Sequence, residues 1–251
     1  MPLSNNKFTI MTAKTRRRIE VKIVVINGTE HKGCTYQIKE AFLSVLRAGN
    51  EITEFYLPKD LPHFCTGCKT CFFKDENLCP HAEYTMPIWK AILQADLLIF
   101  AAPVYALRTP AQMKALLDHF CCHWMVHRPD QAMFIKRAVI LTNSIGASNR
   151  SAQKDLATSL QWMGVSDVSS LGFGLMEGVV WDELSDKRRN KIKAKTANLA
   201  KKYATYQPGR KGLKVRVLFF ISKLLHQAVL KKEEIPSADN QHWIKNGWIK
   251  G

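Results

Sequence analysis

Apolar residues gather in five stretches of the chain, and helical patterns lie between and after them. The strand-like stretches are residues 19–28, 51–57, 96–105, 137–146 and 165–174. Several of them, such as "DLLIFAAPVY", lack a polar residue at every second position, which is typical of parallel strands buried on both faces. The helical patterns cover residues 35–47, 85–95, 109–124, 149–163 and 182–206. Strands that alternate with helices in this way predict an α/β fold with a parallel sheet.

The five predicted strands indicate the fold class, and the segments before and after them indicate the domain boundaries. A five-stranded parallel sheet with helices on both faces is typical of the flavodoxin-like arrangement, whose strand order is 2-1-3-4-5. Residues 1–18 are polar and basic, and we expect a flexible arm there. Residues 19–206 are expected to form the flavodoxin-like domain, with a cysteine loop at 62–82, and residues 207–251 a C-terminal helical extension.

Composition adds a strong positive charge. The formal net charge is +16, from 37 Lys and Arg against 21 Asp and Glu, and such a charge attracts phosphates, anionic cofactors, nucleic acids or acidic membranes. The basic clusters are not interleaved with stacking aromatic residues, so we expect no specific nucleic-acid partner. The sequence shows neither a long apolar run nor the apolar core of a secretory signal, so we expect a cytoplasmic protein without a transmembrane helix.

Candidate binding residues follow three of the predicted strands, because ligands of such sheets bind beyond the carboxyl ends of the strands. The first loop, "NGTEHKGCT" at 27–35, combines glycines and hydroxyls with the start of a helix. It suits a phosphate cradle or an ordinary turn equally well. The "PVY" turn at 103–105 could hold a flat heteroaromatic ring or be a rigid turn. The loop "TNSIGAS" at 142–148 is small and polar, which permits close approach of a ligand to the backbone.

These three loops, in this order, resemble the flavodoxin-like NAD(P)H-dependent oxidoreductases, the group that contains FMN reductases and iron–sulfur flavoproteins. "ADLLIFAAPVYALRTPAQMKALLDHF" is the most similar piece, and the resemblance runs from about residue 21 to 203. It implies FMN as cofactor. The FMN phosphate would lie at Thr29, His31, Gly33, Cys34 and Thr35, and the ring at Pro103, Val104, Tyr105 and Ala106, with further contacts at Thr142 and Gly146.

The resemblance also implies an activity. The protein would be an FMN-dependent oxidoreductase that takes electrons from NADH or NADPH and passes them to a small-molecule or protein acceptor. Tyr105 and Arg108 are the candidate catalytic residues, which would shape the ring site and stabilise reduced flavin. The resemblance further implies a homodimer or homotetramer. The alternatives are an electron carrier that does not react with NAD(P)H, a quinone or azo reductase, and a flavin-free basic binding module.

A second candidate site is the stretch "FCTGCKTCFFKDENLCP" at 64–80. Its cysteines, Cys65, Cys68, Cys71 and Cys79, form a C-x2-C-x2-C-x7-C run. Four thiolates satisfy a [4Fe-4S] cluster or a zinc ion, and reduced thiols without a metal are the third alternative. Iron–sulfur flavoproteins carry a compact cysteine run before the same helix, so the resemblance favours the cluster.

Two further patterns have no assigned role. His119, His123 and His127 recur every four residues and would share one face of a helix, so we expect a packed or dimer-facing stripe rather than a zinc site or a proton relay. The tail carries an apolar helical stripe flanked by lysines and arginines. We expect this stripe to pack on the domain or on a sister subunit, with weak contact to an acidic membrane surface as the alternative. The stripe consists of Val217, Phe220, Ile221, Leu224, Leu225 and Ala228.

Overall fold

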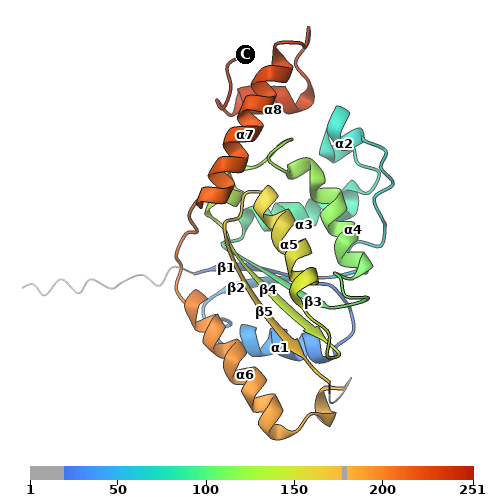
Figure 1. Cartoon of the computed structure of the whole chain (residues 1–251), viewed down its shortest axis with the longest axis vertical. Coiled ribbons are helices and arrows are strands. Elements are labelled where there is room, and N and C mark those ends of the chain that lie inside the picture. Colours follow the sequence, from blue (N-terminus) through green and yellow to red (C-terminus); the bar gives the residue numbers. More distant parts are fainter. Residues whose placement is uncertain (1–19, 177–179) are drawn as a thin grey trace, which may run out of the picture.

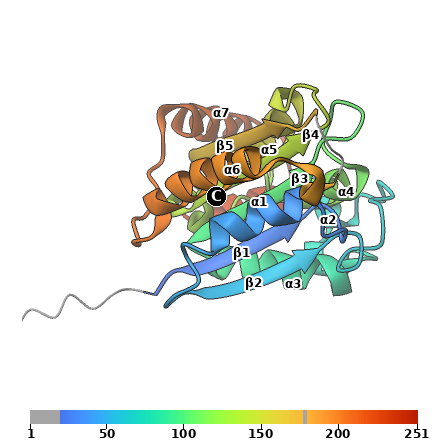
Figure 2. The same ribbon diagram turned by 90° about the horizontal axis from the view of Figure 1, so that it is seen from below.

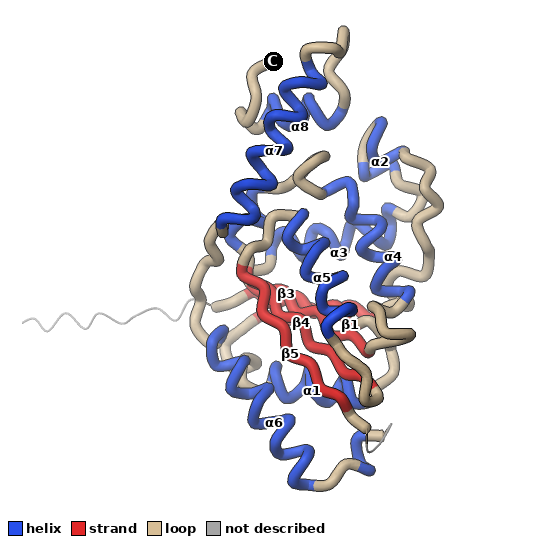
Figure 3. The backbone as a smooth tube through the Cα atoms, viewed as in Figure 1, coloured by secondary structure: helices blue, strands red, loops and turns tan. Residues whose placement is uncertain are grey.

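A parallel five-stranded sheet forms the centre of the molecule, as predicted. The structure is a computed structural model that describes residues 20–176 and 180–251, so the arm expected at 1–18 lies outside the described residues. The strand order is β2-β1-β3-β4-β5, and each neighbouring pair is parallel. Figures 1 and 3 show the strands side by side, with their carboxyl ends at one edge. The strands are β1 (Lys22–Asn27), β2 (Glu51–Tyr56), β3 (Leu97–Pro103), β4 (Arg137–Ser144) and β5 (Asp167–Gly174).

Helices cover both faces of the sheet (Figure 2). One face carries α1 (Cys34–Leu43) and α6 (Asp186–Ala200), and the other carries α3 (Ala82–Gln94), α4 (Ala111–His119) and α5 (Arg150–Trp162). Alternate residues of β1 feed the two cores: Val24 and Ile26 face α3, whereas Ile23 and Val25 face α1. A strand buried on both faces needs apolar residues at every position, which explains the unbroken apolar runs of the sequence.

Between β2 and α3 the chain forms an irregular loop with one short helix, α2 (Thr70–Phe73). This loop carries the four-cysteine run. Short 3-10 helices occur at Glu76–Leu78, Phe120–His123, Gln131–Ile135, Trp181–Glu183 and Lys201–Tyr203. The 3-10 helix Phe120–His123 corrects one prediction. The helix expected over 109–124 is α-helical only to His119 and continues as this tighter helix, so the side chains of its last turn do not follow the α-helical spacing.

The C-terminal extension consists of α7 (Leu213–Leu230) and α8 (Ala238–Lys245), which project from one end of the domain (Figure 1). Trp243 is fully buried, stacks on Phe219 with ring centroids 5.0 Å apart, and donates its indole N–H to the His127 carbonyl at 2.7 Å. The stacking joins α7 to α8, and the indole hydrogen bond to His127 fixes α8 on the domain.

The face of α7 that packs on the domain is not the predicted stripe, and packing of that stripe on a sister subunit stays a prediction. Val215, Ser222 and His226 are the buried residues of α7. The stripe expected to pack is exposed, and Phe220 and Leu225 keep 58% and 53% of their surface in solvent. None of the described helices is both long enough and apolar enough to cross a membrane.

Candidate functional site

A crevice of about 640 Å³ opens at the carboxyl edge of the sheet, beyond β1, β3 and β4. The predicted phosphate residues and the "PVY" turn meet there, although about seventy residues separate them in the sequence. The lining comprises Thr29, His31, Gly33, Cys34, Thr35, Pro103, Val104, Tyr105, Asn143, Ser144, Ile145 and Leu175. Arg108, Ala106, Thr142 and Gly146 are not part of the lining.

The first loop of the crevice places a helix N-terminus at its floor. β1 ends at Asn27, and Gly28 passes so close to β3 that an added Cβ would lie 2.9 Å from the Cβ of Ala102. The chain then turns at Thr29, whose hydroxyl accepts the His31 amide at 3.1 Å. Helix α1 begins after Gly33 without a capping side chain. The positive end of the α1 dipole therefore faces the crevice, where it favours an anion.

The second loop presents an aromatic ring on a tight turn. Tyr105 and Arg108 exchange backbone hydrogen bonds of 3.0 and 2.9 Å. Ala106 and Leu107 between them have φ of 47° and 63°, a left-handed conformation that is uncommon for residues other than glycine. Strained backbone of this kind gathers at binding sites. The Tyr105 side chain keeps 52% of its surface exposed at the crevice mouth.

Arg108 points away from the crevice in this structure. Its guanidinium donates to Asp155 of α5 at 3.0 Å, and its side chain is 65% exposed. The pair is solvent-screened, so it contributes at most about 1 kcal/mol.

The third loop contributes residues that the sequence reasoning passed over. Thr142 is fully buried and accepts Gln153 of α5 at 2.9 Å, so its hydroxyl faces the helix layer. Its neighbour Asn143 faces the crevice, where the Thr35 hydroxyl donates to the Asn143 side-chain oxygen. Gly146 has φ of 75° and an added Cβ would meet Met176 at 2.8 Å, so it shapes the turn without lining the crevice.

The four cysteines line a second hollow, of about 600 Å³, at the C-terminal end of α4 (Ala111–His119). Cys65 and Cys68 are exposed, Cys71 and Cys79 are half-buried, and a fifth thiol, the buried Cys122, joins them. None of these cysteines is in a disulfide. The hollow also receives His81 and His119. Nothing in the sequence signals the approach of Cys122, which is contributed by the 3-10 turn after α4.

Cys71 is the most acidic thiol of the hollow. A hydrogen bond from Cys122, together with the guanidinium of Arg128, lowers the pKa of Cys71 to about 6. The same hydrogen bond and burial raise the pKa of Cys122. Burial raises the pKa of Cys79. One thiolate is therefore present at neutral pH, as metal binding requires.

Arg128 joins the cysteine loop to the C-terminal extension. Its side chain is 7% exposed and pairs with Glu76 of the loop at 3.0 Å and with Asp239 of α8. It also donates to the Cys71 carbonyl. Burial alone would lower the pKa of Arg128, but the carboxylates of Glu76 and Asp239 outweigh it and raise that pKa.

The three histidines of the predicted stripe do not share a face, because the helix changes type after His119. His119 contacts His81 with 2.9 Å between ring nitrogens. His123 is buried and stacks on Trp89, with ring centroids 3.8 Å apart, and burial lowers its pKa to about 3. His127 pairs with Asp239 at 2.8 Å. The packing of these side chains within the domain was predicted, but their common orientation was wrong.

Known proteins resemble this chain over most of its length. A family model described as NADPH-dependent FMN reductase matches residues 21–178. An iron-sulfur flavoprotein of Archaeoglobus fulgidus is 25% identical over 231 residues, which cover 91% of this chain and 100% of that protein. FMN-dependent NADH:quinone oxidoreductase 2 of Pseudomonas putida is 32% identical over 43% of this chain and 58% of that protein. NAD(P)H:quinone oxidoreductase from Methanothermobacter marburgensis shares the fold, with a TM-score of 0.56 and 18% identity over 75% of this chain and 99% of that one.

Proposed function

The chain belongs to the NADPH-dependent FMN reductase family and is an FMN-dependent oxidoreductase; we propose that it oxidises NADH or NADPH at FMN held in the crevice and delivers the electrons to a separate acceptor. The observation that carries this proposal is the meeting of the uncapped start of α1 and the "PVY" turn in one crevice of about 640 Å³.

The crevice offers FMN two different environments. The amides at the start of α1 and the hydroxyls of Thr29 and Thr35 would hold the phosphate, since both can donate to an anion. The backbone of Pro103 and Val104 would hold the edge of the ring, and Tyr105 would cover one of its faces. The Thr35 hydroxyl has a single proton, which it donates to Asn143 in this structure, and it would turn to the phosphate when FMN binds.

Bound FMN supplies the hydride chemistry, and the chain supplies binding, orientation and charge. Tyr105 would limit the access of water to the ring. Arg108 would leave Asp155 and place its positive charge near the ring, which stabilises the negative charge of the reduced form. Because the Arg108–Asp155 pair is exposed, breaking it costs little free energy.

We propose a quinone as the first acceptor to test. The relative from Pseudomonas putida is named for quinone reduction, and exposed apolar side chains around the crevice, Tyr105, Leu107, Ile145 and Met176, suit a flat apolar substrate. The same exposed rim supports a homodimer or homotetramer in which a second copy covers the crevice, because exposed apolar patches mark interaction surfaces.

The cysteine run supports a second redox group. The relative from Archaeoglobus fulgidus is named an iron-sulfur flavoprotein, and Cys65, Cys68, Cys71 and Cys79 all line one hollow. We propose that these four thiolates hold a [4Fe-4S] cluster, which would supply one-electron transfer between FMN and a protein partner.

The exposed stripe of α7 favours an acidic membrane surface as a further contact. Residues 213–232 include five lysines and arginines and no Asp or Glu. A second copy of α7 would bring like charges together, whereas anionic headgroups complement them, and apolar side chains such as Phe220 and Leu224 would enter the interface.

Three measurements on the full chain test the proposed function. FMN should bind at one per chain, NADH or NADPH should bleach the bound flavin, and a quinone should restore its colour with steady turnover. Flavin binding without nicotinamide oxidation would support the electron-carrier alternative. Turnover with azo dyes but not with quinones would leave the site in place and change the acceptor.

A further inference from the structure

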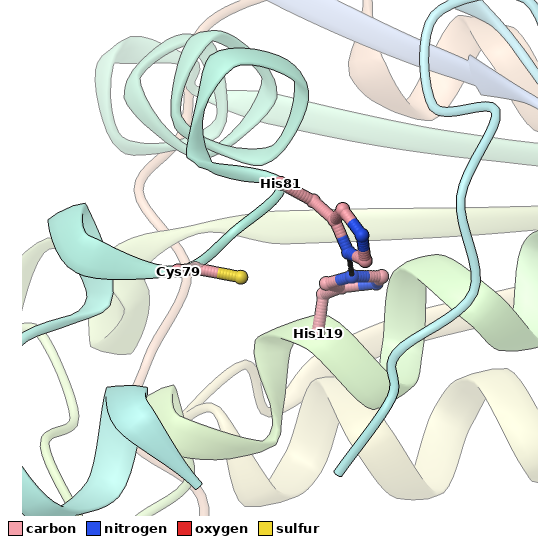
Figure 4. Close-up of side chains that lie close together, drawn as sticks. All are labelled: Cys79, His81 and His119. Carbon is pink, nitrogen blue, oxygen red and sulfur yellow. Dashed lines mark hydrogen bonds between the residues drawn. The ribbon is translucent and has the colours of Figure 1, made fainter. Parts of the chain in front are cut away.

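A cysteine and two histidines from two segments of the chain converge in the cysteine hollow. Cys79 follows the 3-10 helix Glu76–Leu78, His81 precedes α3, and His119 ends α4. One ligand atom from each residue lies within 4.8 Å of the other two. Figure 4 shows the Cys79 side chain directed toward the two imidazole rings, which are joined by a hydrogen bond. The remaining described residues contain no other group of three potential ligands that meets so closely.

The orientation of His119 is fixed as in known metal sites. Its Nδ1 lies 2.7 Å from the Ala115 carbonyl oxygen, one helical turn earlier, and must carry the proton to donate there. The lone pair is therefore on Nε2, the nitrogen that faces His81. A backbone carbonyl that accepts from the far nitrogen is the usual outer-shell partner of a ligating histidine.

His81 completes a pair of nitrogen donors. Its Nδ1 lies 2.9 Å from His119 Nε2, so without a metal it donates a proton into that lone pair. With its proton moved to Nε2, His81 would present a second lone pair to the same point. His63 stacks on the outer side of His81, with ring centroids 4.7 Å apart, and holds this ring without reaching the ligand group.

This donor set is chemically distinct from four thiolates. One thiolate and two imidazoles suit Zn²⁺, which prefers mixed sulfur and nitrogen ligands in tetrahedral geometry. We infer that Cys79, His81 and His119 form a mononuclear Zn²⁺ site whose fourth position is taken by water. On binding, the Cys79 thiol releases its proton to solvent and the sulfur binds the metal.

The zinc site and the proposed cluster share Cys79 and therefore exclude one another. When Cys79 binds zinc together with His81 and His119, the cluster proposed on Cys65, Cys68, Cys71 and Cys79 lacks one of its ligands. A chain with a complete cluster has no thiolate for zinc. The hollow thus has two alternative metal states.

Separate variants distinguish the two donor sets. Zinc alone is titrated into the metal-free, FMN-loaded full chain with a competing chromophoric chelator, and Co²⁺ is added in parallel to reveal a thiolate-to-metal charge-transfer band. His81→Ala and His119→Ala should each weaken zinc binding by at least the roughly 10- to 100-fold that loss of an outer-shell partner causes. Both variants should still bind FMN, and both should assemble the iron–sulfur cluster.

The converse variant and a matched control complete the test. Cys65→Ser combined with Cys68→Ser should prevent cluster assembly and leave zinc affinity within about twofold, since neither thiol belongs to the proposed ligand set. His63→Ala removes the neighbouring ring only and should also leave zinc affinity nearly unchanged. Zinc affinity that survives both His81→Ala and His119→Ala, or that falls with the two serine substitutions, would overturn the assignment, whatever the outcome for FMN.

Discussion

Replacement of Arg128 by Met tests how the cysteine loop and the C-terminal extension are held. Arg128 is 7% exposed and bridges Glu76 of the loop and Asp239 of α8, while it donates to the Cys71 carbonyl. Met keeps much of the side-chain volume and removes the charge. Both carboxylates then lose their buried partner, and breaking such a pair costs about 3–5 kcal/mol.

The expected loss is large enough to measure in the FMN-loaded chain. For a chain of this size, 1 kcal/mol shifts the melting temperature by about 2–4 °C, so Arg128→Met should lower it by roughly 6–20 °C. Urea unfolding gives the same loss as a free energy. Arg47→Met is the matched control, since Arg47 pairs with Glu40 at the surface with 51% of its side chain exposed. That exposed pair should cost at most about 1 kcal/mol. Equal losses in the two variants would refute the view that Arg128 is a structural bridge.

Three further predictions concern other parts of the chain. Thr35→Val removes a hydroxyl proposed to bind the FMN phosphate. The loss of one hydrogen bond to a charged group should weaken FMN affinity by about 10- to 100-fold in a fluorescence titration, whereas Thr35→Ser should bind FMN normally. Lys136 is buried, which lowers its pKa to about 8. Between about pH 8 and 10.5 the folded chain therefore binds fewer protons than the unfolded chain, so the free energy of unfolding should rise with pH. Lys136→Met should flatten this rise, as measured by urea unfolding at several pH values. The α7 stripe should carry the chain to vesicles rich in phosphatidylglycerol but not to neutral vesicles, and Phe220→Ser with Leu224→Ser should abolish that flotation.

The carboxyl edge of the sheet could be predicted because parallel strands end together. Apolar runs place the strand ends, and the loops 27–35 and 103–105 follow them directly, so the part of the lining that these two loops contribute could be expected without coordinates. The choice between Thr142 and Asn143 could not be made in the same way. Neighbouring residues of a strand point to opposite faces, and an uncertainty of one residue in the strand end exchanges them.

Contacts between segments that are distant in the sequence could not be predicted from the sequence pattern. The stretch "HFCCHW" contains no glycine or proline that would predict the end of α4 at His119. The stacking of His123 on Trp89, which is distant in the sequence, accompanies this end. The tail contains more apolar residues than one buried helix face accommodates, so the sequence does not show which of them are buried. The aromatic contacts of Phe219 and Trp243 decide which face of α7 is buried, and that pairing has no local signal in either segment.

The most direct test of the central claim is an anaerobic titration of the purified chain with NADPH, followed by its absorption spectrum. Chain reconstituted with FMN should show the bands of one bound flavin, and these bands should bleach on addition of NADPH or NADH. Chain that binds no flavin after reconstitution, or that binds it without any bleaching by either nucleotide, would contradict the account.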